Sequence, residues 1–179
     1  MTHRPIIGVM GSGNNVHCER ARALGLWLAK AGFHLLTGGG GGVMQTVSKA
    51  FCDVSNRKGL VIGVVPCTES DPTCRPQPGY PNESVEIRIF THLFLTGNRG
   101  TESMSRNHIN VLSSDVIIAL PGGPGTAGEV QLALRYGRPI VVYASNRDEI
   151  PALRQEITVE TDFGRLQDFV RACIANKHD

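Results

Sequence analysis

The sequence predicts an α/β fold built on a doubly wound, mainly parallel sheet. Short apolar segments alternate along the chain with longer amphipathic ones, as in repeated strand–helix units. Most of the apolar segments are nearly continuous, which is typical of parallel strands covered on both faces. The length of 179 residues suits one hydrophobic core. We therefore expect residues 1–179 to form a single Rossmann-like domain.

The expected strands are short and rich in Val, Ile and Leu. They lie at Ile6–Met10, His34–Thr37, Leu60–Val65, Val85–Phe90, Val116–Leu120 and Ile140–Tyr143. The expected helices fall between them and after the last: Val16–Ala31, Val43–Asn56, Met104–Leu112, Thr126–Tyr136 and Phe163–Ala175. The first helix carries Ala23, Leu24, Trp27 and Leu28 on one face. The segment Pro66–Ser84 holds five of the ten prolines, which predicts a long loop of the kind that is often functional.

Composition excludes several classes of protein. The formal charge is +2 without a block of like charges, so we expect no nucleic-acid partner. The five cysteines contain no CxxC pair, which argues against structural zinc or a disulfide framework. No run reaches the ~18 apolar residues of a membrane span, and Met1 leads into a strand rather than a signal peptide. We expect a cytoplasmic protein without a membrane partner.

Three glycine-rich turns follow expected strands and precede expected helices. They contain Gly11 and Ser12; Gly39, Gly40 and Gly41; and Pro121, Gly122, Gly123, Gly125 and Thr126. Ligands of doubly wound sheets bind at the carboxyl ends of the strands, where helix N-termini offer N–H groups to anions. Glycines can also simply tighten such turns, but three of them at one edge favour a phosphate site. The sequence has no GxxxxGK[ST] motif, and a bound pyrophosphate would lie close to Glu129, so an NAD site is not expected.

Two charged residues flank the third turn. Glu129 falls in the first turn of the expected helix, where a carboxylate can serve simply to complement the helix dipole. Arg106 lies at the start of an expected helix. This helix and the strand after it lead back to the same edge of the sheet, so Arg106 can reach Glu129 or a phosphate, or lie on the surface. His17, His92 and His108 have no ligand-like spacing, and we expect no metal site.

The segment Pro121–Glu129 resembles the PGGxGTxxE motif of the LOG (lonely guy) family, often labelled lysine decarboxylase-like. Thr37–Met44 is similar to the family's second glycine turn. The resemblance implies a phosphoribohydrolase that splits a nucleoside 5′-monophosphate, with Arg106 and Glu129 catalytic and the glycine turns holding phosphate. Met104-Ser-Arg-Asn107 departs from the enzymes' MHERK and looks more like the molybdenum cofactor carrier branch. The alternative is therefore a non-enzymatic carrier or binding protein for a phosphorylated ligand such as molybdenum cofactor. A non-catalytic, nucleotide-sensing partner protein is a third hypothesis.

The expected hydrolysis would need no metal and no cofactor. A carboxylate at Glu129 would stabilise positive charge developing on the ribose, and Arg106 would hold that carboxylate ionised. The resemblance also implies a homodimer or homotetramer. Its interface would use apolar side chains beside the third turn, at Met104, Ile109, Leu112, Leu132 and Leu134.

Overall fold

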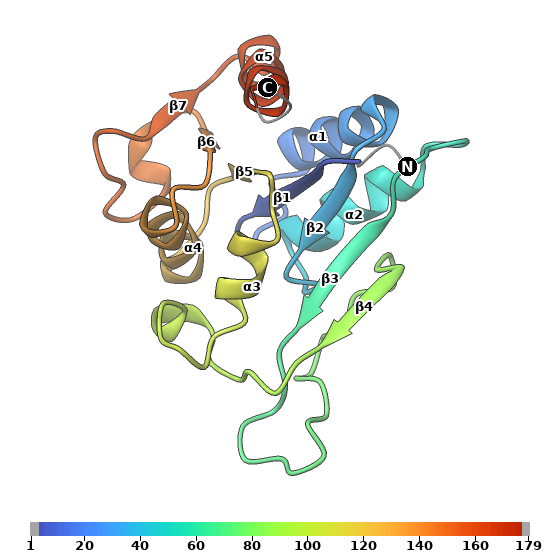
Figure 1. Cartoon of the computed structure of the whole chain (residues 1–179), viewed down its shortest axis with the longest axis vertical. Coiled ribbons are helices and arrows are strands. Elements are labelled where there is room, and N and C mark those ends of the chain that lie inside the picture. The colour runs from blue at the N-terminus through green and yellow to red at the C-terminus, as the bar shows by residue number, and fades with distance from the viewer. Residues whose placement is uncertain (1–3, 177–179) are drawn as a thin grey trace.

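The structure is a computed structural model that describes residues 4–176. In this range seven strands form one sheet in the order β4-β3-β2-β1-β5-β6-β7 (Figure 1). Every neighbouring pair is parallel. The strands are β1 (Ile6–Met10), β2 (His34–Thr37), β3 (Val61–Val65), β4 (Ile87–Phe90), β5 (Val116–Ala119), β6 (Ile140–Tyr143) and β7 (Thr158–Glu160). The predicted Rossmann-like α/β fold is confirmed.

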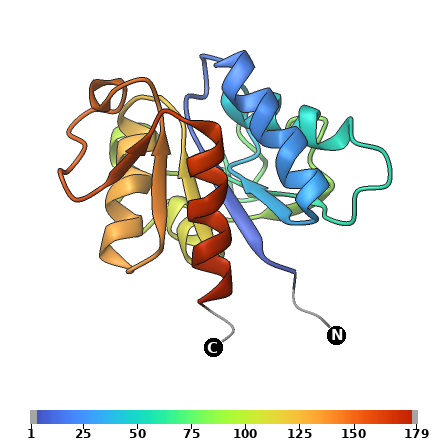
Figure 2. The ribbon, with the colours of Figure 1, turned by 90° about the horizontal axis from the view of Figure 1, so that it is seen from above.

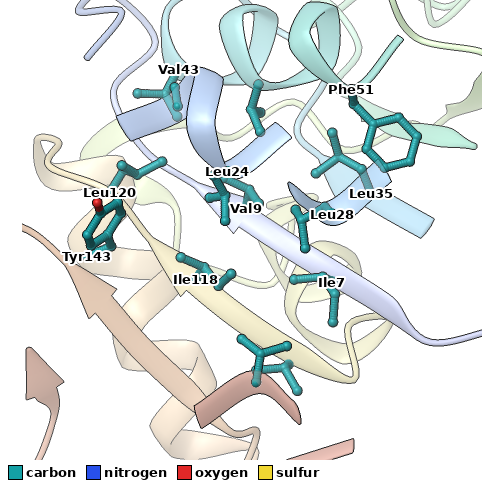
Figure 3. Close-up of a cluster of buried hydrophobic side chains, with 14 of the residues drawn as sticks. Ile7, Val9, Leu24, Leu28, Leu35, Val43, Phe51, Ile118, Leu120 and Tyr143 are labelled. Carbon is teal, nitrogen blue, oxygen red and sulfur yellow. The ribbon is translucent and has the colours of Figure 1, made fainter. Parts of the chain in front are cut away.

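Helices cover both faces of the sheet. They are α1 (Cys18–Ala31), α2 (Val43–Cys52), α3 (Asn107–Leu112), α4 (Pro124–Arg135) and α5 (Phe163–Ala175), with 3-10 turns η1 (Gly97–Arg99) and η2 (Arg147–Glu149). Helices α1, α2 and α5 pack on one face, and α3 and α4 pack on the other (Figure 2). Side chains of adjacent residues in a strand point to opposite faces. Leu35 packs in the first core layer, under α1, α2 and α5, and Leu36 packs in the second core layer, under α3 and α4. Figure 3 shows the first layer, in which Leu24 and Leu28 of α1 meet Ile7 and Val9 of β1.

Some element boundaries differ from those expected. Strand β7 was not expected, because Thr158-Val-Glu160 carries no apolar run. Helix α4 begins at Pro124, two residues before the expected start, since proline is well suited to the first helical position. Helix α2 ends at Cys52 instead of Asn56, which has a positive φ of 59°. Leu132 is fully buried in the second core layer, so its expected place at an exposed interface is wrong.

The strand order reverses between β1 and β5. From β1 the chain moves outward through β2 and β3 to β4, then returns to the other side of β1 to form β5. At such a switch point, the connections leaving two adjacent strands run in opposite directions and leave a crevice at the carboxyl ends. The three glycine turns meet here: Ser12 N donates to Pro121 O at 3.2 Å, and Val43 N donates to Ser12 O at 2.9 Å.

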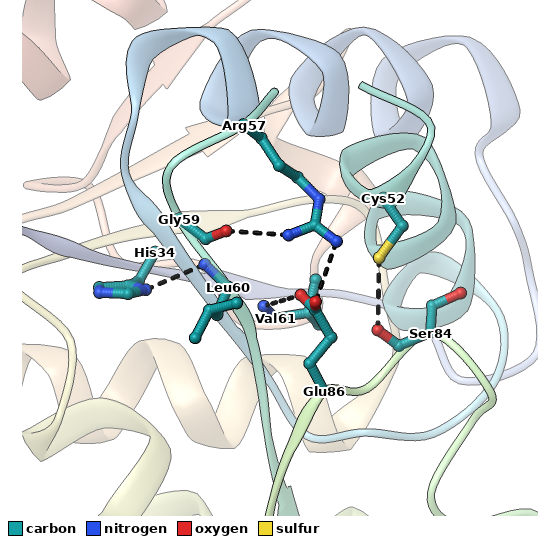
Figure 4. Close-up of polar contacts among 8 residues, drawn as sticks. All are labelled: His34, Cys52, Arg57, Gly59, Leu60, Val61, Ser84 and Glu86. Atoms are coloured by element: carbon teal, nitrogen blue, oxygen red, sulfur yellow. Dashed lines mark hydrogen bonds and ion pairs between the residues drawn. The ribbon is translucent and has the colours of Figure 1, made fainter. Parts of the chain in front are cut away.

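A polar network holds the amino ends of β3 and β4, at the edge of the sheet opposite the glycine turns (Figure 4). Glu86 accepts from Arg57 Nη2 and from Val61 N, each at 2.9 Å, and Arg57 Nη1 donates to Gly59 O at 3.0 Å. The network ties β4 to β3 and thereby fixes the point where the long loop of residues 66–84 returns to the sheet. In the part of the chain described, no helix has the length and apolar character needed to span a membrane.

Candidate functional site

A cleft of about 420 Å³ opens at the carboxyl ends of β1 and β5. Its volume falls in the range of small-molecule sites. The turns after β1 and β5, the start of α3, the η1 turn and the long loop all contribute to its walls. The lining residues are Val9, Met10, Gly11, Ser12, Gly13, Asn14, Gly38, Met44, Tyr80, Thr96, Gly97, Arg106, Asn107, Gly123, Pro124, Gly125, Thr126 and Glu129.

The N-terminus of α4 lies in the wall of this cleft and has no side-chain cap. Gly123 is the N-cap residue and supplies no side-chain cap, and Pro124 has no N–H. The first backbone bond of the helix runs from Ala127 N to Gly123 O at 3.1 Å, so the N–H groups of Gly125 and Thr126 precede it. A helix start with uncapped N–H groups and the positive end of the dipole is a site for an anion.

Arg106 and Glu129 form a buried ion pair in the wall of the cleft. Arg106 Nη1 lies 3.6 Å from Glu129 Oε1, and the two side chains are 6% and 9% exposed. Asn110 Nδ2 donates to the same Glu129 oxygen at 3.0 Å, and Arg106 Nη1 donates to Asn107 Oδ1 at 3.1 Å. Among the described residues, neither Arg106 Nε nor Asn110 Oδ1 has a hydrogen-bond partner. Within the described part of the chain, two polar atoms beside the ion pair are therefore buried without a partner.

Local backbone structure explains where the two charges lie. Arg106 is the N-cap of α3, and its carbonyl accepts from Ile109 N and Asn110 N. Its guanidinium lies against Gly38, where a Cβ would come within 2.3 Å of Nη2, so any larger residue there would displace it. Glu129 is the sixth residue of α4, because the helix starts at Pro124. The interpretation of Glu129 as a first-turn dipole partner is therefore wrong.

Burial raises the pKa of Glu129 above its ordinary value, although Arg106 and the hydrogen bond from Asn110 act in the opposite direction. A raised pKa in the folded protein means that protonation of Glu129 favours folding. The free energy of unfolding should therefore fall as pH rises above about 4.3, the ordinary glutamate value. The fall should end once pH has passed the raised pKa.

The Glu129→Gln variant has no carboxyl group to titrate at this position. Comparison with it therefore isolates the contribution of Glu129 to the pH dependence of the free energy of unfolding. Urea unfolding of wild type and variant at matched pH values gives the difference between their free energies. We expect the wild-type value, relative to the variant, to decrease with pH. A difference that is constant or increases with pH contradicts a raised pKa at Glu129.

The long loop of residues 66–84 forms part of the site. Asn82 N donates to Gly39 O at 2.7 Å, and Asn82 Nδ2 donates to Gly40 O at 2.8 Å. The Tyr80 ring lies against Gly40, where a Cβ would be 2.8 Å from the ring, and Arg106 Cζ is 6.0 Å from the ring centroid. The second glycine turn thus receives the loop, and the loop contributes the Tyr80 ring to the lining of the cleft.

The expected binding residues fall into two groups. Gly11, Ser12, Gly123, Gly125, Thr126, Arg106 and Glu129 line the cleft. The others shape the backbone beneath it. Gly39 and Gly40 receive the loop, Gly41 lies close to Gly13 O, Pro121 accepts from Ser12 N, and Gly122 N donates to Glu149 O. Sequence reasoning missed Gly38, Tyr80 and Asn110. Only Gly38 carried a signal, as the first glycine after β2.

The fold and the cleft define a Rossmann-like α/β protein with a glycine-lined site at the switch point of its sheet. The chain belongs to the SLOG cluster4 family, whose family model matches residues 4–172. An uncharacterized protein of Archaeoglobus fulgidus is 32% identical over 139 residues, which cover 75% of this chain and 76% of that protein.

Solved structures of molybdenum cofactor proteins are similar over nearly their whole length. The molybdenum cofactor binding protein of Rippkaea orientalis is 30% identical, with a TM-score of 0.74 and coverage of 97% of this chain and 99% of that one. The Moco carrier protein of Chlamydomonas reinhardtii is 30% identical, with a TM-score of 0.72 and the same coverage. DNA processing protein A of Helicobacter pylori shares the fold at 16% identity and a TM-score of 0.56, over 94% of this chain and 73% of that one.

Proposed function

We propose that this protein binds and carries a phosphorylated small molecule of the molybdenum cofactor type. The observation that carries the proposal is the uncapped N-terminus of α4, which faces a cleft closed on one side by Arg106. The relatives of 30% identity, described as molybdenum cofactor binding or carrier proteins, support it. The carrier was the alternative in the sequence analysis and is now the leading hypothesis.

We infer that different parts of the cleft bind the phosphate and the ring system of such a ligand. Gly125 N and Thr126 N would donate to the phosphate, and the dipole of α4 would stabilise its charge. The ring of Tyr80 would contact the planar heterocycle, and Arg106 would donate from its guanidinium. The cleft then recognises a phosphate at one end and a planar ring at the other.

Gly123→Asp tests the phosphate end. An aspartate at an N-cap accepts from the first N–H groups of its helix, so α4 stays stable while a negative charge occupies the anion site. A Cβ at Gly123 meets no atom within 4 Å, and its φ of −90° suits any residue. We expect affinity for molybdenum cofactor, or for AMP as a probe, to fall about a hundredfold, ~2.8 kcal/mol.

Gly123→Ala is the matched control, because it adds a methyl group without charge or acceptor. Its affinity should stay within about threefold of wild type, ~0.7 kcal/mol. Calorimetric titration of both variants measures the effect. Equal affinity of wild type and Gly123→Asp for the phosphorylated probe would place the phosphate elsewhere.

Hydrolysis of a nucleoside monophosphate is the second candidate, favoured by the presence of Glu129 and Arg106 in the cleft wall. The relatives of 30% identity, described as molybdenum cofactor binding or carrier proteins, favour the carrier over this reaction. Incubation with AMP and isopentenyl-AMP, scored for ribose 5-phosphate, separates the two. Release that Glu129→Gln abolishes, with AMP affinity kept within about tenfold (~1.4 kcal/mol), would establish the enzyme. No release supports the carrier.

We also propose that the protein acts as a homodimer or homotetramer in the cytoplasm, without nucleic acid or membrane partners. Leu112, 44% exposed at the end of α3, is the most exposed of the expected interface residues. Light scattering at micromolar concentration tests the assembly: a mass at the 19.3 kDa of one chain would refute it.

A further inference from the structure

Two cysteines lie on one side of the long loop, away from the cleft. Cys67 and Cys74 line a separate surface hollow of about 320 Å³ together with Asp71 and His92. Cys67 is 4% exposed, whereas Cys74 is exposed to solvent. One thiol of the pair is therefore shielded and the other can be reached by a reagent.

The backbone of the loop brings the two thiols together. Cys67 forms an antiparallel bridge with Pro76, and Thr68 N donates to Arg75 O at 2.7 Å. In antiparallel pairing, the residue two positions from the directly opposite one is a diagonal neighbour on the same face, and Cys74 has this relation to Cys67. Burial raises the pKa of the Cys67 thiol, and interaction with the Cys74 thiol raises it further.

We propose that Cys67 and Cys74 are a thiol–disulfide pair, oxidised reversibly by peroxide. Hydrogen peroxide transfers one oxygen to the exposed Cys74 thiolate, which becomes a sulfenic acid, and its other oxygen leaves as hydroxide. The Cys67 sulfur then attacks the Cys74 sulfur, forming the S–S bond, and the sulfenic oxygen leaves as water with the proton of Cys67. Two thiols and one hydrogen peroxide give one disulfide and two waters. A dithiol reductant reverses the reaction.

The pair is connected to the ligand cleft through the base of the loop. Gln77 N donates to Pro66 O at 3.2 Å, and Gln77 Nε2 donates to Cys67 O and Phe94 O, each at 2.9 Å. Tyr80 N in turn donates to Gln77 O at 3.1 Å. Figure 1 shows the outer part of this loop extending away from the sheet beyond β3. A cross-link across the loop therefore restrains the segment that places Tyr80 in the cleft wall.

Peptide mapping tests the chemistry. Glu69 lies between the two cysteines, so cleavage after it by a glutamate-specific protease separates them unless a disulfide joins the fragments. After treatment of the reduced protein with hydrogen peroxide, we expect an intact mass lower by two hydrogens. We also expect fragments that separate only on reduction. Oxidation that stops at Cys74 sulfinic acid, or that gives only intermolecular disulfides, overturns the proposal.

Two variants complete the test. Cys67→Ser removes the resolving thiol, so Cys74 should oxidise without the internal cross-link. Cys18→Ser, at the exposed start of α1, is the matched control and should form the cross-link as wild type does. An internal disulfide that still forms in Cys67→Ser would show that Cys67 is not the partner of Cys74.

Hydrogen exchange tests the connection to the cleft. The amides of Gln77, Tyr80 and Asn82 are all hydrogen bonded within the loop or to the second glycine turn. Their exchange should slow about threefold or more on oxidation, because a cross-linked loop opens less often. Unchanged exchange in a protein that has formed the disulfide would show that the pair does not restrain the cleft wall.

Discussion

Replacing Arg106 by methionine should lower the free energy of unfolding by about 3–5 kcal/mol, because the change leaves Glu129 buried without its ionic partner. Methionine keeps much of the volume of the side chain, so the effect comes mainly from charge. Under the proposed function, the variant should also bind phosphorylated ligands less tightly, since the guanidinium in the cleft wall would be absent. Urea unfolding at neutral pH measures the first effect.

Two further variants identify the cause. Arg106→Met combined with Glu129→Gln removes both charges, and we expect it to recover most of the stability that the single change loses. Arg135→Met alters an exposed arginine on α4 and should change stability by no more than about 0.5 kcal/mol. If the double variant is no more stable than Arg106→Met, packing rather than charge dominates at this position.

Gly25→Leu should abolish cooperative folding or cost about 3 kcal/mol or more, because α1 and α2 pack with their backbones in near contact at this glycine. A Cβ on Gly25 would lie 2.4 Å from Val47 O and 3.0 Å from Phe51 N, which are backbone atoms of α2. These atoms cannot move aside without shifting the whole helix. Thermal unfolding followed by circular dichroism measures the loss.

Ala31→Leu on the same helix is the control, since Ala31 is exposed at the last turn of α1. It should unfold close to the wild-type temperature. A Gly25→Leu variant of near wild-type stability would mean that α1 and α2 can separate at little cost.

The fold could be predicted because continuous apolar segments such as those of the central strands indicate buried parallel strands. Val116-Ile-Ile-Ala119 and Val61-Ile-Gly-Val-Val65 are buried along their whole length, as their sequences indicate. Strand β7 was missed because an edge strand need not be apolar: Thr158 is exposed and Glu160 only partly buried. Its position depends on pairing with β6, a long-range contact that no local pattern records.

The candidate site was predictable where it lies next to regular elements. Arg106 and Glu129 meet because one helix and one strand separate Arg106 from the third glycine turn, and such a unit returns the chain to the same edge of the sheet. Tyr80 was not predictable, because its place depends on how Asn82 bonds to the carbonyls of Gly39 and Gly40. Residues of an irregular loop carry no periodic signal that would give their direction.

The helices that begin around the cleft lack side-chain caps. No side chain caps α1 at His17, α2 at Gly42 or α4 at Gly123, whereas Asp162 caps α5 by accepting from Arg165 N at 2.9 Å. A phosphate bound at α4 would supply the missing acceptor and, by mass action, stabilise only the folded chain. In a cell, the ligand-free protein would then be the form that unfolds and is degraded first. The abundance of the protein would in this way follow the supply of its ligand.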